Sequence, residues 1–356
     1  MELKNRLILE EYRKSREDFL RIEQIVAEML DKIVADTGAR VFATQHRVKE
    51  EKSLAGKLVR KGDWYSSLGD LTDILGARVI LYFSDDIDVV GRAVEEAFDI
   101  DWENSSDKRE LIGAETFGYL SLHRICSLPE GYPEELRKWR FEIQIRTALQ
   151  HVWSDINHDM GYKNEFGVPR EVTRAFSRVS ALLEVADSEF VHARNMMNDY
   201  TEDVRSRIIS GNADDVALSG VSLGEFIRRN TKMRAFLEKI AGIAGAEIEE
   251  TDPGNYLEQL NWLGITTLGG LQQLLDDNEE MATKMVERTL EGAELDVLSS
   301  SVALRYLCRA EICRRGLGED EVAEFLALSL KDKMRSARRA RYLIDSYKKL
   351  QVEEAE

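Results

Sequence analysis

A change in hydrophobic periodicity near residue 165 limits the folds open to this chain. Before that point, three segments have the apolar and β-branched composition of strands: Ala77–Phe83, Leu122–Leu128 and Trp139–Arg146. After it, apolar residues recur at helical spacing. The pattern predicts an α+β domain over residues 1–210 and an all-α C-terminal region over residues 211–356.

The composition favours a soluble protein of two domains. Of 356 residues, 43% are hydrophobic and 32% are charged, and no stretch has the ~20 uncharged apolar residues of a membrane helix. The N-terminus lacks the pattern of a signal peptide. The three cysteines contain no CxxC pair, which argues against a disulfide scaffold. We therefore expect a cytoplasmic protein with no membrane partner.

The charge balance is acidic overall. Lys and Arg total 49 and Asp and Glu total 66, which gives a net charge of −17. Such a chain is not expected to coat itself with nucleic acid. A cleft can still hold charge of the opposite sign, so the distribution of cations decides which ligands are possible.

The first cationic segment follows residue 46. On a strand, Arg47 and Lys49 point to the same face. Ser53 is a candidate N-cap for a basic helix containing Lys57, and the helix would offer free N–H groups to an anion. The segment suits a polyphosphate. The alternative is a solvated basic edge.

Two further segments each contain one residue with a candidate role. Asp73 comes just before the strand Ala77–Phe83, where a carboxylate can hold Mg²⁺ or only close a turn. Tyr119 follows Gly118, and a tyrosine there can stack on a base or start a strand in the core.

The fourth segment alternates. In Phe141–Thr147, the polar residues Glu142, Gln144 and Arg146 share one face of a strand, opposite an apolar face. That arrangement suggests that the polar face lines a cleft. Glu142 would complete a metal site with Asp73 or accept a proton from a hydroxyl.

The four segments together resemble the RelA/SpoT synthetase domain, the GTP pyrophosphokinase family. The motifs occur in the family's order over residues 40–165: R-x-K…S-x-x-x-K, T-D-I-x-G-x-R-V, G-Y-x-S-x-H, and E-x-Q-I-R-T followed by H-x-x-x-Y-K. The resemblance implies a mixed β-sheet of the nucleotidyltransferase (polymerase-β) type with flanking helices. It also implies transfer of the β,γ-diphosphate of ATP to the ribose 3′-hydroxyl of GDP or GTP, which makes ppGpp and pppGpp.

The resemblance also implies roles for single residues. Arg47 and Arg78 would sandwich the adenine of ATP. The ATP phosphates would be held by three residues of the first segment: Lys49, Ser53 and Lys57. Asp73 would bind Mg²⁺, with Glu142 as second ligand or as base. The acceptor would contact residues of the last two segments: Tyr119, which would stack on guanine, His123, Gln144, Arg146 and His151.

The sequence departs from the family pattern at one place. The common synthetases have a lysine shortly before the tyrosine, whereas Ile112–Phe117 contains none, and Lys108 and Arg109 lie further upstream. In addition, Phe117–Tyr119 and Gln150–Trp153 are similar to a subgroup that includes toxic small synthetases. Some of those act on the 3′-CCA end of tRNA. The alternatives are therefore the same chemistry on tRNA, as a toxin of toxin–antitoxin type, or a degenerate module that senses nucleotides.

No family is recognised after residue 211. Residues 247–291 contain eleven acidic residues, and residues 331–349 contain eight basic ones. The basic segment is interpreted as a solvated helix face, with contact to RNA or to the acidic segment as alternatives. The His158–Asp159 dipeptide lacks the upstream ligands of an alarmone hydrolase, so a hydrolase site is not expected. A regulatory role for this half and a homo-oligomer are further expectations.

Overall fold

Two compact units make up the chain. The computed structural model describes residues 3–61, 64–111, 121–162, 169–290, 292, 295–330 and 332–353. The units are Met1–Arg194 and Asn195–Glu356, and each has its own hydrophobic core. The division lies inside helix α7 (Arg170–Ser210), whereas the sequence put the domain boundary at the polar turn that follows this helix.

The N-terminal unit alternates helices and strands. Its strands are β1 (Val41–Val48), β2 (Leu75–Leu81), β3 (Asp99–Ile100), β4 (Ser106–Asp107), β5 (Leu122–Ser127) and β6 (Phe141–Thr147). Its helices are α1 (Leu3–Thr37), α2 (Glu51–Lys61), the 3₁₀ turn η2 (Leu68–Asp70), α3 (Asp86–Ala97), α4 (Lys108–Leu111), α5 (Glu134–Arg137), α6 (Ala148–Tyr162) and the first part of α7.

The strands form one mixed sheet in the order β1-β2-β6-β5-β3, and β4 also pairs with β5. Only β2 and β6 run parallel, and the other pairs are antiparallel. The α+β class and the mixed sheet predicted for this region are therefore confirmed.

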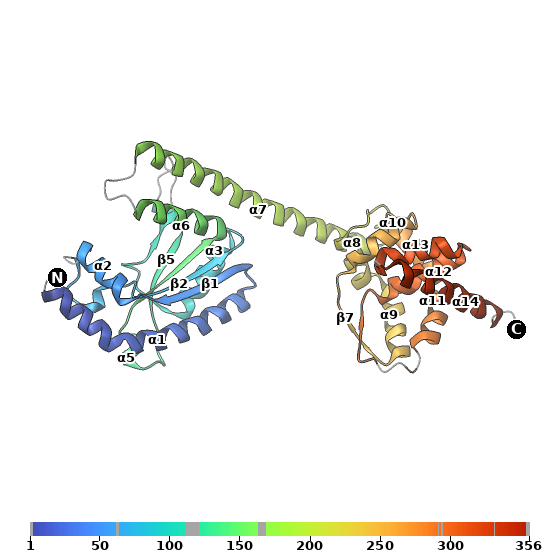
Figure 1. Ribbon diagram of the computed structural model, residues 1–356, viewed down its shortest axis with the longest axis horizontal. Coiled ribbons are helices and arrows are strands. Elements are labelled where there is room, and N and C mark those ends of the chain that lie inside the picture. Colours follow the sequence, from blue (N-terminus) through green and yellow to red (C-terminus); the bar gives the residue numbers. More distant parts are fainter. Residues whose placement is uncertain are drawn as a thin grey trace. The chain divides into compact units, whose positions relative to one another are not determined.

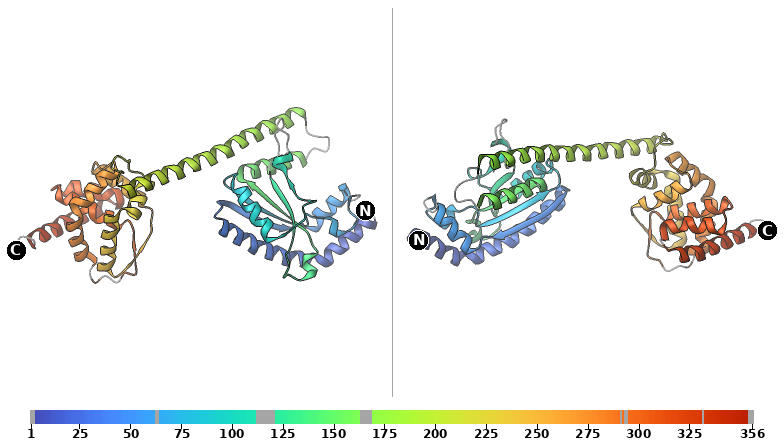
Figure 2. Two further views of the ribbon diagram at one scale, coloured as in Figure 1. Left: turned by 180° about the vertical axis from the view of Figure 1, so that it is seen from behind. Right: turned by 45° about the horizontal axis from the view of Figure 1, so that its top comes forward.

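Alternation along the strands gives the sheet two different faces. One face packs on α1 and α3 and contributes Phe141, Ile143 and Ile145 to the core. Figure 1 and Figure 2 show α1 along this side of the sheet and α6 on the other. The opposite face carries polar side chains and borders α6. The structure thus confirms the apolar face predicted for β6 and leaves its polar face available for ligands.

Helix α2 begins earlier than predicted. The sequence reading had Ser53 as N-cap, but the helix starts at Glu51, and the amide of Leu54 donates to the carbonyl of Glu50. Glu51 is a good helix former, and a carboxylate in the first turn is favoured by the helix dipole. Ser53 therefore lies inside the first turn and does not cap it.

The C-terminal unit is helical, as predicted. Its helices are α8 (Gly220–Arg229), α9 (Thr231–Ala244), the 3₁₀ turn η3 (Pro253–Tyr256), α10 (Leu257–Trp262), α11 (Leu268–Leu290), α12 (Val302–Arg314), α13 (Glu319–Leu330) and α14 (Lys333–Glu353). It also contains a short parallel pair that the sequence did not indicate, β7 (Glu247–Glu249) and β8 (Val297–Ser299). Three-residue strands are too short to have a recognisable period. Among the described helices, none combines the length and apolarity needed to cross a bilayer.

Candidate active site

Strand register brings the predicted polar residues side by side. Arg78 on β2 lies opposite Gln144 on β6, and Gln144 lies opposite His123 on β5. In the next row, Arg47 on β1 lies opposite Gly76 on β2, which is paired with Glu142. Four consecutive strands therefore present their functional groups on one face of the sheet.

These rows line a cavity of about 300 Å³. Six predicted residues line it: Arg47, Lys49, Asp73, Arg78, Glu142 and Gln144. Gly76 lies in the second row between Arg47 and Glu142, and a Cβ at this position would meet no atom within 4 Å. The missing side chain keeps the centre of the cavity open. We call this space the N-terminal cavity.

Asp73 joins two lysines at the edge of the cavity. Its carboxylate accepts from Lys49 Nζ at 2.5 Å and from Lys57 Nζ at 2.7 Å. Burial raises the pKa of Asp73, but the two ammonium groups outweigh it and hold the pKa below its ordinary value. Burial lowers the pKa of Lys49 by more than Asp73 raises it, whereas for Lys57 the carboxylate prevails. The charged form of Lys49 is thus less stabilised than that of Lys57, and a bound phosphate would stabilise it.

Glu142 is oriented by two neighbours. His123 Nδ1 lies 2.6 Å from one carboxylate oxygen, and the amide of Gln144 donates to the other at 2.8 Å. Burial and the charge of Asp73 raise the pKa of Glu142, but the hydrogen bonds from His123 and Gln144 prevail, and the pKa lies below its ordinary value. Glu142 is therefore a fixed anionic acceptor at neutral pH, as a general base must be.

A second charge cluster connects β2, β6 and α6. Asp155 lies 4.0 Å from Arg78, 3.7 Å from Arg146 and 3.7 Å from His151 Nδ1. Arg146 is 1% exposed, so it positions neighbours more than it meets solvent. Burial and the adjacent arginines lower the pKa of His151. His151 is therefore neutral at pH 7 and can accept as well as donate a hydrogen bond.

The structure brings most of the predicted site together but leaves one described residue, Ser53, apart. Ser53 is exposed on α2 and does not line the N-terminal cavity. Tyr119 lies outside the described residues.

The sequence analysis noted Lys108 only as lying upstream and gave it no role; this residue follows the short strand that pairs with β5. Burial lowers its pKa, Glu142 acts in the opposite direction and Arg146 in the same direction, so its ammonium group is close to both. The sequence did contain a signal for this residue. Ile112–Phe117 lacks the lysine of the family pattern, so another nearby cation, such as Lys108, could have been expected to replace it.

The oxygen donors of the cavity suit a hard divalent cation. Asp73 and Glu142 line the same space, and Mg²⁺ is commonly held by one or two carboxylates together with substrate phosphates. Among the described residues there is no group of three or more His, Cys, Asp or Glu able to hold a metal by itself. Asp73 and Glu142 could hold such a cation together with the phosphates of a nucleotide.

The motif order and geometry agree with a match to a known family. Residues 46–166 match the family described as "Region found in RelA / SpoT proteins". This part of the chain is a RelA/SpoT region. The sequence prediction of the RelA/SpoT-type domain is thus confirmed for this segment.

Two curated relatives and a solved structure are similar to the RelA/SpoT region. GTP pyrophosphokinase YwaC of Bacillus subtilis is 28% identical over 42% of this chain and 71% of its own length. GTP pyrophosphokinase YjbM of the same organism is 29% identical over 42% of this chain and 69% of its own length. The crystal structure of small alarmone synthetase 1 from Bacillus subtilis is 22% identical, covers 53% of this chain and 99% of its own, and has a TM-score of 0.46.

Proposed function

We propose that the RelA/SpoT region is a GTP pyrophosphokinase that transfers the β,γ-diphosphate of ATP to the ribose 3′-hydroxyl of GDP or GTP. The curated relatives carry this name. The observation that carries the proposal is the position of an anionic, doubly hydrogen-bonded Glu142 in the same cavity as Arg47, Lys49 and Arg78. A base beside cations suited to a polyphosphate is what the transfer requires.

The donor half of the site follows from the strand register. Arg47 and Arg78 lie diagonally across β1 and β2, a separation of roughly 7–8 Å between backbones. An aromatic ring stacked between two planar groups needs about twice the van der Waals contact distance of ~3.5 Å. The two guanidinium groups therefore suit the two faces of adenine, with Lys49 and Lys57 directed at the phosphates through their common partner, Asp73.

Mg²⁺ would be held by Asp73 and Glu142 together with the phosphates of ATP. When bound, it would supply charge neutralisation on the transferred diphosphate. Lys49 and Lys57 would then shift from the carboxylate of Asp73 to phosphate oxygens, because Mg²⁺ and the two lysines compete for the carboxylate of Asp73. This exchange needs no backbone movement, since long lysine side chains can pivot.

Glu142 acts on the acceptor. The proton of the ribose 3′-hydroxyl passes to the Glu142 carboxylate while the 3′-oxygen forms a bond to the β-phosphorus. The bond from that phosphorus to the oxygen bridging to the α-phosphate breaks, and its electron pair leaves with AMP. His123 and Gln144 hold the carboxylate of Glu142 in one orientation throughout. The reaction therefore need not supply the entropy cost of orienting the base.

The acceptor side uses residues of the last two sequence segments and of α6. Tyr119 stacks on the guanine, and Arg146, Gln144 and His151 shape the pocket next to α6. Lys108 supplies the cation that the Ile112–Phe117 stretch lacks, because its pKa responds to both Glu142 and Arg146. A homo-oligomer and a regulatory role of the helical C-terminal half remain predictions.

A labelled transfer assay tests the function. The full-length protein is incubated with Mg²⁺, γ-³²P-labelled ATP and, separately, GDP, GTP or bulk tRNA, with Glu142→Gln as the inactive control. We expect label on the guanosine nucleotides. Label on tRNA alone would identify the toxin-type acceptor and contradict the proposal. ATP binding without transfer to any acceptor would leave only a nucleotide-sensing module.

A further inference from the structure

The helical C-terminal unit contains a second cationic cavity. It has a volume of about 260 Å³ and lies between α11, α12, α13 and α14. Three arginines line it, Arg305 and Arg309 from α12 and Arg339 from α14. The remaining polar groups are hydroxyls, among them those of Thr289 and Tyr306, which lie 2.7 Å apart. We call this cavity the arginine pocket.

The three arginines have no acidic partners. Among the described residues, no ion pair or hydrogen bond involves the guanidinium group of any of the three. Burial lowers the pKa of Arg309, and the neighbouring charges of Arg305 and Arg339 lower it further. In a chain with a net charge of −17, this absence is not caused by a shortage of carboxylates.

The arrangement works against the stability of the unit. Arg305 and Arg309 are four residues apart on α12, a spacing at which like charges disfavour a helix. Arg339 adds a third like charge from a different helix, and Arg309 is partly buried. Cations are commonly gathered in this way where an anion is to be bound, because the ligand then removes the repulsion.

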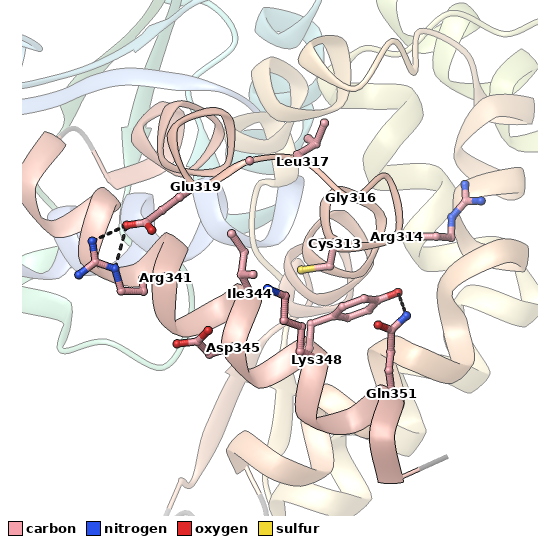
Figure 3. Close-up of a pocket in the computed structure, with 12 residues that line it drawn as sticks. Cys313, Arg314, Gly316, Leu317, Glu319, Arg341, Ile344, Asp345, Lys348 and Gln351 are labelled. Atoms are coloured by element: carbon pink, nitrogen blue, oxygen red, sulfur yellow. Dashed lines mark hydrogen bonds and ion pairs between the residues drawn. The ribbon is translucent and has the colours of Figure 1, made fainter. Parts of the chain in front are cut away.

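A neighbouring cavity provides a contrast. The space in Figure 3, of about 520 Å³, is lined by residues on another side of α14 and by the ends of α12 and α13. There the arginines are paired: Arg341 with Glu319 at 2.7 Å and Arg314 with Glu311 at 2.9 Å. Both arginines of that space are therefore neutralised by a carboxylate, whereas the arginines of the arginine pocket are not.

We propose that the arginine pocket binds the phosphate or diphosphate group of a small molecule, at a site separate from the N-terminal cavity. Three guanidinium forks can engage the oxygens of one phosphate group with paired hydrogen bonds. A volume of about 260 Å³ suits a single small anion better than the extended backbone of a nucleic acid. Tyr342, which is 65% exposed at the rim, is available to contact the organic part of the ligand.

Calorimetric titration of the full-length protein with inorganic pyrophosphate, and separately with orthophosphate, tests this site at fixed ionic strength. The wild type is compared with Arg309→Met, Arg309→Lys and Arg341→Gln. Arg341→Gln removes one positive charge from α14 outside the pocket. It therefore controls for a general change in the electrostatic potential of the unit. Binding in the N-terminal cavity contributes equally to all four proteins.

We expect Arg309→Met to lose one pyrophosphate site per chain, or to bind there about 10-fold or more weakly, and Arg309→Lys to bind with intermediate affinity. Arg341→Gln should bind as the wild type does. Arg309→Met should also unfold at a temperature no lower than the wild type, because it removes an unpartnered buried cation. Unchanged stoichiometry and affinity in Arg309→Met, or an equal loss in Arg341→Gln, would overturn the proposal.

Discussion

The N-terminal cavity and the arginine pocket both gather cations, but of the two only the N-terminal cavity is also lined by carboxylates. Lys49 and Lys57 share Asp73, and Glu142 is fixed by His123 and Gln144. The three guanidinium groups of the arginine pocket have no carboxylate partner among the described residues.

The difference reflects what each site has to do. A reaction site needs its groups oriented before substrate arrives, whereas a binding site can store repulsion that the ligand removes. Paired charges therefore indicate positioning for chemistry, and unpaired ones indicate an anion still to be bound.

The largest expected effect concerns the base. Glu142→Gln keeps the shape of the side chain and the contact with Gln144 but cannot take the acceptor proton. We expect turnover to fall by about 10²–10⁴-fold, the usual contribution of general base catalysis. Glu103→Gln, an exposed glutamate outside the cavity, is the matched control. Near-wild-type turnover in a folded Glu142→Gln protein would remove the assignment.

A pH effect should distinguish the two units. Asp187 on α7 is buried, and burial raises its pKa to about 6 although Thr147 donates a hydrogen bond to it. In the unfolded chain the carboxyl group of Asp187 has a pKa of about 3.8. Between pH 4 and 6 the folded protein therefore binds one more proton than the unfolded chain, and the free energy of unfolding falls as the pH rises. A shift of about two pKa units corresponds to at most about 3 kcal/mol.

Tryptophan fluorescence during urea unfolding measures this effect. Four of the five tryptophans, Trp64, Trp102, Trp139 and Trp153, lie in the N-terminal unit, so the signal reports mainly on that unit. In Asp187→Asn the decline between pH 4 and 6 should be absent. An identical decline in wild type and variant would show that another group is responsible.

The acceptor contact should have a smaller effect. Tyr119→Ala is expected to weaken the use of GDP or GTP by ~1–3 kcal/mol, the range for stacking of a base on an aromatic ring. ATP affinity should change little. Steady-state kinetics with each substrate varied in turn provide the measurement, and Tyr119→Phe is the conservative control. If ATP affinity collapsed while acceptor use survived, Tyr119 would belong to the donor half.

The smallest change concerns the floor of the N-terminal cavity. Gly76→Ala introduces a methyl group into open space between Arg47 and Glu142, where it meets no atom in the ligand-free protein. Because glycine is unfavourable within a strand, the variant should be more stable by roughly 0.5–1 kcal/mol. The KM for ATP should rise, since the methyl group occupies ligand space. A loss of stability, or an unchanged KM for ATP, would contradict this view of the cavity.

Strand alternation made the N-terminal cavity predictable. The polar face of Phe141–Thr147 follows from a period of two, and the neighbouring strands contribute Arg47 in the row of Glu142 and Arg78 in the row of Gln144. Lys108 was not predictable in the same way, because its approach to Glu142 depends on the pairing of β4 with β5. The predicted start of α2 was wrong by three residues because Ser53 was given more weight as a cap than Glu51 as a helix former.

The arginine pocket of the C-terminal unit was harder to predict from the sequence. Arg305 and Arg309 can be recognised as one helix face, but only the packing of α12 against α14 adds Arg339. The basic segment 331–349 was interpreted as a solvated face. Its arginines are exposed, in agreement with that interpretation, and two of them have further contacts: Arg339 lines the arginine pocket and Arg341 pairs with Glu319. Such contacts between helices have no sequence period.

The central claim is that the N-terminal cavity transfers a diphosphate and not a single phosphate. The most direct test follows ATP labelled with ³²P at the β-position in one reaction and at the γ-position in another, with GDP as acceptor, and quantifies AMP and ADP. The account predicts that both labels move to the guanosine product together and that one AMP is released for each product formed. Movement of the γ-label alone, with release of ADP, would contradict it.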